Sequence, residues 1–207
     1  MEHPYEVERK YRVGRKHFPA IEVTLLDMGF RAVPTKQLDT YLHAAEPRVT
    51  RRVRRERGPD GTVYLRTDKC KSKVGRNTNR EVETGISEES YQSAVLNEVM
   101  SLYDTPLRVK KRRVHFHGEF DGEPVTVCLD LKARGGDDIM LGRFVELEIM
   151  VSSAEEIPGA HKLLKALAGE VLPRCRQREL RGYRTMLVEA LARRDKKARK
   201  KVLKKKR

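Results

Sequence analysis

The feature that most constrains this sequence is a charged alternation with a period of two, which recurs in several short segments. Near the N-terminus, Glu6, Glu8 and Lys10 alternate with Val7 and Tyr11. Side chains of a β-strand point alternately to opposite faces, so these charges share one face. The same spacing places charges of one sign on one face at Arg52/Arg54, Glu81/Glu83, Lys111/Arg113 and Glu146/Glu148, and puts Asp130 between two leucines.

A single strand of this kind is typical of a half-exposed sheet whose charges face water. Several unmixed rows in one chain favour another arrangement, because solvated faces have little need of pairs such as Glu146/Glu148 and Arg52/Arg54. If helices cover the apolar outer faces, the charged rows line an interior. We therefore predict an α+β fold, a closed antiparallel β-barrel, or tunnel, of about eight strands with a charged interior and flanking helices.

Turn residues and hydrophobic periodicity divide the chain into elements. Residues 58–61 and 121–124 carry hairpin signals. Alternating runs predict strands at 5–13, 37–42, 50–56, 63–70, 80–86, 107–116, 125–131 and 143–151, although Lys110 and Arg112 interrupt the alternation of the sixth. Helical spacing predicts helices at 17–29, 87–102, 154–168 and from 177 onward.

An interior lined by carboxylates needs compensation. Carboxylates buried side by side raise one another's pKa and destabilise the fold unless cations or a ligand neutralise them. Hard divalent cations prefer carboxylate oxygens, and Mg²⁺ shares its shell with phosphate oxygens. Lys and Arg rows match the remaining phosphate charge. The sequence therefore predicts a linear polyphosphate bound with Mg²⁺ or Mn²⁺.

The net charge of +15 is concentrated at the C-terminus. Residues 193–207 hold eleven Lys or Arg and one acid, Asp195, which is 11 − 1 = +10 and leaves 15 − 10 = +5 for the rest. We expect a tunnel domain at 1–192 and a basic tail at 193–207 that frays beyond Arg193 unless a polyanion is bound. The tail has the charge to contact RNA or another polyanion, and a solvated extension without a partner is the alternative.

Other features exclude several classes of protein. No run approaches the roughly 18 apolar residues of a membrane span, and the N-terminus lacks the apolar core of a secretory signal. Cys70, Cys128 and Cys175 are too few and too widely spaced for a disulfide framework or a zinc pattern. We expect a cytoplasmic protein with reduced cysteines and no membrane contact.

The N-terminal run Glu6-Val7-Glu8-Arg9-Lys10 resembles the E-x-E-x-K signature of the CYTH superfamily, the triphosphate tunnel metalloenzymes. That superfamily holds thiamine triphosphatases, tripolyphosphatases, fungal-type RNA triphosphatases and class IV adenylate cyclases. The strongest match is the segment 141–148, which resembles the family's L-G-x-F-x-E-x-E and follows Leu129-Asp130. Between these lie, in the family's order, Gln37 to Tyr41, Arg52-Val53-Arg54, Thr67-Asp68-Lys69, Arg80 to Glu83 and Lys111-Arg112-Arg113.

The resemblance implies roles for thirteen residues. It implies that the metal-facing carboxylates are Glu6, Glu8, Glu81, Glu83, Asp130, Glu146 and Glu148. It implies that the triphosphate is held by Lys10, Arg52, Arg54, Lys69, Lys111 and Arg113, with Lys10, Lys69 and Glu148 in catalysis. For Glu81 and Glu83, orienting the basic rows is the alternative to contacting metal.

The implied activity is metal-dependent hydrolysis of a triphosphate, either inorganic tripolyphosphate, thiamine triphosphate or a nucleoside triphosphate. The short connection between Tyr41 and Arg52 lacks the insertion associated with class IV cyclases, which favours a hydrolase. Conversion of ATP to cyclic AMP and pyrophosphate is the alternative reaction. A non-catalytic module that binds polyphosphate or RNA ends is a third reading.

Overall fold

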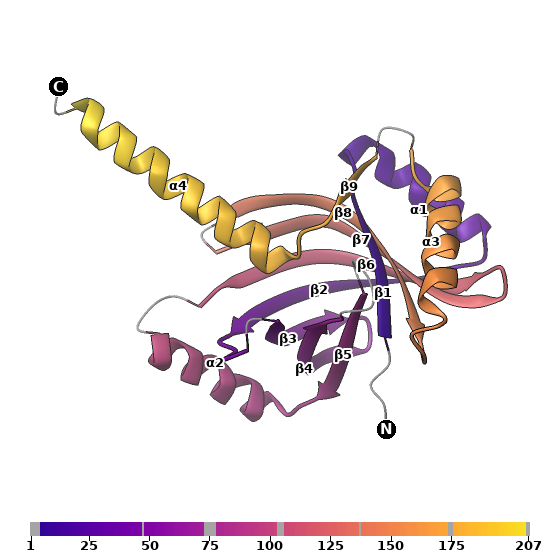
Figure 1. Ribbon diagram of the computed structural model, residues 1–207, viewed down its shortest axis with the longest axis horizontal. Helices are drawn as coiled ribbons and strands as arrows, with labels where there is room; N and C mark the ends of the chain where they lie inside the picture. The colour runs from indigo at the N-terminus through magenta and orange to yellow at the C-terminus, as the bar shows by residue number, and fades with distance from the viewer. Residues whose placement is uncertain are drawn as a thin grey trace.

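The computed structural model describes residues 5–46, 48–72, 78–102, 106–136, 138–173 and 176–205 (Figure 1). The strands are β1 (Tyr5–Arg12), β2 (Arg31–Leu42), β3 (Val49–Gly58), β4 (Gly61–Lys71), β5 (Thr78–Gly85), β6 (Arg108–Phe120), β7 (Glu123–Gly135), β8 (Ile139–Val151) and β9 (Gln177–Glu179). The helices are the 3₁₀ turn η1 (Arg15–His17), α1 (Phe18–Asp27), α2 (Glu88–Leu102), α3 (Ile157–Val171) and α4 (Tyr183–Lys205).

Eight antiparallel strands close into a barrel, which confirms the predicted fold. Their order is β5-β4-β3-β2-β6-β7-β8-β1, and a further pairing of β1 with β5 joins the two ends of the sheet. That closing pair runs from Tyr5 opposite Arg80 to Val7 opposite Thr78. The same edge of β1 then pairs with the short β9, where Lys10 lies opposite Glu179.

Apolar side chains lie mainly between the barrel wall and the helices outside it. The larger core joins α1 and α3 to the outer faces of β1, β7 and β8, with Val7, Leu25, Leu147 and Leu164 fully or almost fully buried. Figure 1 shows α1 and α3 together beside these strands. Because the apolar faces are used on the outside, the charged faces of the strands turn inward.

A smaller core lies where α4 meets the barrel. It contains Phe144, Tyr183 and Leu187 together with neighbouring apolar residues of β6, β7 and β8. A Cβ atom added to Gly135 would overlap the Leu187 side chain, so α4 packs directly on the backbone there. The start of α4 therefore covers part of one end of the barrel.

The predicted elements are present, and one prediction at the C-terminus is wrong. The helix predicted from residue 177 begins only at Tyr183, because Gln177–Glu179 pair as β9 with an edge of β1 that β5 leaves open. Pairing that edge satisfies backbone groups that would otherwise lack partners. From Tyr183, α4 continues to Lys205, into the basic tail, and the fraying expected beyond Arg193 stays a prediction.

Several strands, most clearly β2, β7 and β8, extend further than the sequence pattern indicated. The β6–β7 hairpin turns at Asp121 and Gly122, which both have positive φ (51° and 78°), as a tight two-residue turn requires.

Of the cysteines, Cys70 is exposed, Cys128 is buried and both are free thiols, while Cys175 lies outside the described residues. Within the described ranges, no helix combines the length and apolarity needed to cross a membrane.

Candidate active site inside the barrel

The barrel encloses a cavity of about 250 Å³ whose lining is almost entirely charged or polar. Nine of the thirteen predicted site residues line it: Glu6, Glu8, Lys10, Arg52, Lys69, Lys111, Arg113, Glu146 and Glu148. They point inward because side chains alternate along a strand, and the residues between them face the apolar cores outside the barrel. The other four lie next to the lining. Glu81, Glu83 and Asp130 each form an ion pair with a lining residue. Arg54 pairs with Asp39, which also contacts the lining residues Arg52 and Lys111.

Carboxylates from three strands converge at one side of the cavity. The Lys69 ammonium contacts Glu6 and lies 3.4 Å from Glu8 and 3.2 Å from Glu81. Glu148 lies directly opposite Glu8 in the β1–β8 pairing. Four acidic side chains therefore surround one ammonium group, which leaves this side of the cavity short of positive charge.

The pKa values of two of these carboxyls record that shortage. Burial, followed by repulsion from Glu146 and Glu8, raises the pKa of Glu148 to about 7. Burial also raises the pKa of Glu6 well above its usual value, despite the opposing effect of Lys69, and Glu81 and Glu148 add to the rise. An additional cation would relieve the repulsion among these groups.

A second group joins β1, β6, β7 and β8. The Lys10 ammonium lies 2.8 Å from Glu146, and the Arg113 guanidinium contacts Glu146 and donates two hydrogen bonds of 2.7 Å to Asp130. Asp130 is fully buried. Both oxygens of Asp130 accept hydrogen bonds from Arg113, so Asp130 holds this guanidinium in place. The role in metal binding that the family resemblance implies for Asp130 stays a prediction.

Asp39 is a buried carboxylate to which neither the charge pattern nor the family resemblance gave a role. It is 0% exposed and accepts hydrogen bonds of 2.6 and 3.3 Å from Arg54. The Lys111 ammonium lies 3.2 Å away and the Arg52 guanidinium 3.8 Å away. Asp39 thus organises three of the predicted phosphate-binding cations. The sequence did hold one signal for this position: Asp39 lies two residues after Gln37, so both side chains are on the same face of β2.

The cations around Asp39 do not all remain strongly basic. Burial and then repulsion from Arg113 lower the pKa of Lys111 to about 8, although Asp39 opposes the change. Lys111 therefore lies in a region with more positive charge than its single carboxylate partner neutralises. This side of the cavity has an excess of positive charge, in contrast to the acidic side, and is therefore suited to bind an anion.

Tyr183, the first residue of α4, closes the site and was also missed. Its hydroxyl donates a hydrogen bond to Asp130, and its ring lies 4.2 Å from the Lys10 ammonium and 5.0 Å from that of Lys111, measured to the ring centroid. These contacts place an aromatic face against two cations.

Glu83 is the most exposed of the four predicted site residues that do not line the cavity. It is 39% exposed, accepts a hydrogen bond of 2.9 Å from Thr67 and lies 3.9 Å from Arg52. These contacts fit the alternative role of orienting a basic side chain. Glu81, 3.6 Å from Arg52 and 3.2 Å from Lys69, lies closer to the acidic side.

The donor set fits a hard divalent cation by its chemistry. Glu6, Glu8 and Glu148 offer only carboxylate oxygens, which Mg²⁺ and Mn²⁺ prefer over nitrogen or sulfur donors. Across the described part of the chain, no three acidic, His or Cys side chains form a ready metal cage. The physical reason is visible at Lys69, whose ammonium occupies the space among Glu6, Glu8 and Glu81.

A closed antiparallel barrel with an ionisable interior and an outer layer of helices defines a class of charged-tunnel proteins. A family model described as the CYTH domain matches residues 4–183. The chain therefore belongs to the CYTH domain family, as the motifs indicated. Among curated proteins, none matches this chain.

Solved structures with the same fold include two proteins from one organism. The PH1819 protein of Pyrococcus horikoshii OT3 is 22% identical with a TM-score of 0.66, covering 89% of this chain and 98% of that chain. The PH1012 protein of the same organism is 23% identical with a TM-score of 0.64, covering 88% and 99%. A candidate adenylate cyclase from Vibrio parahaemolyticus is 25% identical with a TM-score of 0.62, covering 89% and 98%.

Proposed function

We propose that this protein is a metal-dependent triphosphatase that hydrolyses a phosphoanhydride bond of a linear triphosphate inside the barrel. The observation that carries the proposal is the division of one cavity into an acidic side and a basic side. Glu6, Glu8 and Glu148 crowd one side, while Arg52 and Lys111 lie on the other. A triphosphate with its divalent cations is a ligand that neutralises both sides together.

The basic side chains would bind the non-bridging phosphate oxygens. Lys10, Arg52, Arg54, Lys69, Lys111 and Arg113 would hold the substrate and stabilise charge on the transferring phosphoryl group. Asp39 and Asp130 position three of the Arg and Lys groups by direct ion pairs. The protein thereby fixes its cations before the substrate enters, which is how such sites lower the barrier.

The acidic side would hold the metal. Glu6, Glu8 and Glu148 would bind Mg²⁺ or Mn²⁺, and neighbouring carboxylates would share a second ion. When bound, the metal supplies charge neutralisation and a more acidic attacking water. The water oxygen bonds to the terminal phosphorus, the bond from that phosphorus to the bridging oxygen breaks, and orthophosphate leaves with the shortened polyphosphate.

Lys69 has a specific part in this scheme. Its ammonium now neutralises Glu6, Glu8 and Glu81. Once divalent charge is bound there, the same side chain is available to a phosphate oxygen. We therefore expect substrate and metal to bind more tightly together than separately.

Adenylate cyclase activity is the second candidate, supported by the 25% identity to the candidate cyclase from Vibrio parahaemolyticus. That reaction requires the 3′-hydroxyl of ATP to attack the α-phosphorus, and hence a pocket for the nucleoside. The aromatic residues among those lining the described cavity are Tyr41 and Tyr183, and Tyr183 is engaged by Asp130. The connection from β2, which ends at Leu42, to β3, which begins at Val49, is also short. Both observations favour the hydrolase.

The test is one incubation series with Mg²⁺ or Mn²⁺ and tripolyphosphate, thiamine triphosphate, ATP and 5′-triphosphorylated RNA, with every product resolved. Orthophosphate supports the triphosphatase. Cyclic AMP with pyrophosphate would establish the cyclase instead, and absence of turnover with both metals would favour a binding module.

The matched variants are Glu148→Gln and Glu119→Gln. Glu148 lines the cavity, whereas Glu119 is exposed on β6. We expect Glu148→Gln to lower turnover at least about a hundredfold while circular dichroism remains unchanged, and Glu119→Gln to retain the wild-type rate. A wild-type rate in Glu148→Gln would refute the metal assignment.

A further inference from the structure

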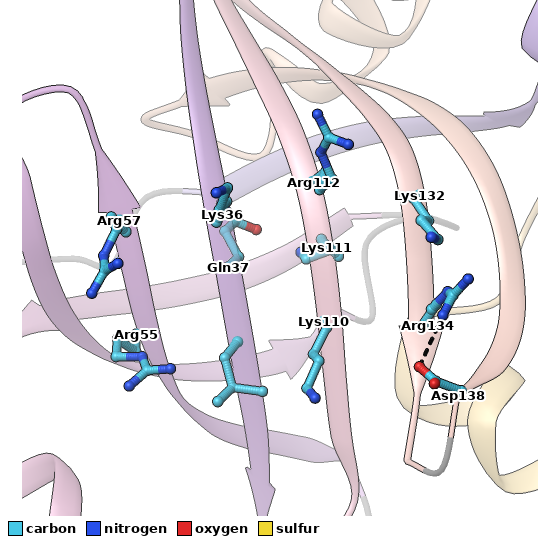
Figure 2. Close-up of a pocket in the computed structure, with 11 residues that line it drawn as sticks. Lys36, Gln37, Arg55, Arg57, Lys110, Lys111, Arg112, Lys132, Arg134 and Asp138 are labelled. Atoms are coloured by element: carbon cyan, nitrogen blue, oxygen red, sulfur yellow. Dashed lines mark hydrogen bonds and ion pairs between the residues drawn. The ribbon is translucent and has the colours of Figure 1, made fainter.

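A second charged surface lies on the outside of the barrel, across β3, β2, β6 and β7. It is made of seven cations, here called the basic ladder: Lys36, Arg55, Arg57, Lys110, Arg112, Lys132 and Arg134. They line a hollow of about 410 Å³ together with Gln37, Leu38, Lys111 and Asp138. Figure 2 shows these side chains on four neighbouring strands.

The strand register arranges the ladder in two rows. In the first, Lys36 lies between Arg57 and Arg112, and Arg112 lies opposite Lys132. In the second, Leu38 lies between Arg55 and Lys110, and Lys110 lies opposite Arg134. Like charges directly opposite each other on adjacent strands destabilise a sheet. The first row repeats that unfavourable pairing three times.

Almost nothing neutralises these charges. Within the described ranges, the ion pair formed by a ladder residue is the one between Arg134 and Asp138, at 3.0 Å. The outer wall is built differently elsewhere, since Asp68 on β4 pairs with Arg51 at 2.6 Å and with Arg66 at 3.5 Å. The barrel thus carries paired charges on one part of its outer face and unpaired cations on another.

The ladder is separate from the cavity inside the barrel. Lys36 and Arg112 face outward, while their neighbours Gln37 and Arg113 are buried facing inward. A ligand on the ladder therefore does not compete with a ligand in the cavity. The proposed triphosphatase activity gives the ladder no role.

The dimensions and composition of the ladder point to an extended polyanion. Four strands span three spacings of about 4.8 Å, or about 14 Å, and the two rows lie about 7 Å apart along each strand. No aromatic side chain is among the described lining residues. Proteins that bind single-stranded nucleic acid use aromatic platforms for base stacking, whereas contacts to duplexes go largely to phosphate oxygens.

The C-terminal helix α4 leaves the ladder uncovered, because it packs on the other face of β7. Leu187 meets Gly135, whose Cβ direction is opposite to that of its neighbour, the ladder residue Arg134. Residues 193–207 carry a further eleven Lys or Arg. We propose that the basic ladder binds the phosphate backbone of duplex nucleic acid, without sequence preference.

The test measures binding of the full-length protein to short labelled duplexes of two unrelated sequences by fluorescence anisotropy, between about 50 and 200 mM salt. The ladder variant replaces Lys36, Arg57, Lys110 and Arg112 by Gln; all four are exposed. The matched control replaces the exposed cations Arg15, Lys16, Lys162 and Lys165, on η1 and α3, by Gln, which removes the same charge.

We expect the ladder variant to bind both duplexes at least about tenfold more weakly at ~0.1 M salt. The slope of log K against log salt should become shallower by about 3–4, because each lost phosphate contact removes about 0.9. The control variant should weaken binding by less than half as much on a logarithmic scale, which is less than about threefold if the ladder variant loses tenfold. Thermal unfolding provides the check on folding, and the ladder variant should be as stable as the wild type or more so, since repulsion is relieved.

Three results would overturn the proposal. The first is equal loss of duplex binding in the ladder variant and the control. The second is loss of all duplex binding on deletion of residues 194–207, with no effect of the ladder variant. The third is binding of inorganic polyphosphate, and not of duplexes, by the ladder, which would identify a different polyanion.

Discussion

Asp39 provides the sharpest test of how the interior is held together. It is fully buried and in contact with Arg54 at 2.6 Å, Lys111 at 3.2 Å and Arg52 at 3.8 Å. The substitution Asp39→Asn preserves the shape of the side chain and removes the charge. It leaves three cations beside one another without the carboxylate that neutralises them.

The expected loss is large because the pair is buried. Breaking a buried ion pair by removing one partner costs about 3–5 kcal/mol. For a chain of this size that corresponds to a fall of about 6–20 °C in the unfolding temperature. Asp68→Asn is the matched control, since Asp68 also contacts an arginine at 2.6 Å but is 33% exposed. An exposed pair contributes about 0–1 kcal/mol.

The pH dependence gives a second readout with a defined sign. Burial alone would raise the pKa of Asp39, but Arg54, Lys111 and Arg52 outweigh it and hold the pKa well below its usual value. A carboxyl with a lowered folded-state pKa stabilises the fold above its unfolded pKa of about 3.9 and loses that contribution as the pH falls through the folded value. The difference between wild type and Asp39→Asn should therefore persist from pH 7 to about pH 4 and shrink below it.

The assay is urea unfolding of the wild type and both variants at several pH values, without divalent cations. Tripolyphosphate should then stabilise Asp39→Asn more than the wild type, because the ligand replaces the lost negative charge. An Asp39→Asn variant as stable as Asp68→Asn would refute the reasoning, since it would mean that the interior cations do not depend on this carboxylate.

Three further predictions test packing, the tail and the closure of the site. Gly118→Ala should destabilise the fold by about 1–3 kcal/mol in urea unfolding, because the added Cβ would lie 2.7 Å from the Phe30 ring, whereas Gly85→Ala, with nothing within 4 Å, should be neutral or stabilising. Deletion of residues 194–207 should leave turnover of small triphosphates unchanged in a phosphate-release assay, and a large loss would show that the tail belongs to the site. Tyr183→Phe should lower stability by about 1.5–3 kcal/mol, since its hydroxyl donates to a buried carboxylate; an unchanged unfolding curve would contradict that contact.

The period-two alternation by itself determined which face of each strand turns inward. Glu146, Glu148, Arg52 and Lys111 line the cavity as their parity predicted. This succeeded because the direction of a side chain in a strand depends only on local backbone geometry. The turn residues and the family motifs likewise located the strands and the closed barrel without any long-range information.

Tertiary structure alone decided which charges meet. Asp39 became the partner of Arg54 and Lys111 because β2 pairs with both β3 and β6, and no local pattern specifies that register. Lys110 and Arg112 interrupted the predicted alternation, and only the pairing with β2 and β7 shows that they form a ladder on the outer wall. Sequence parity fixes the face of one strand, whereas contacts across strands depend on registers between segments far apart in the chain.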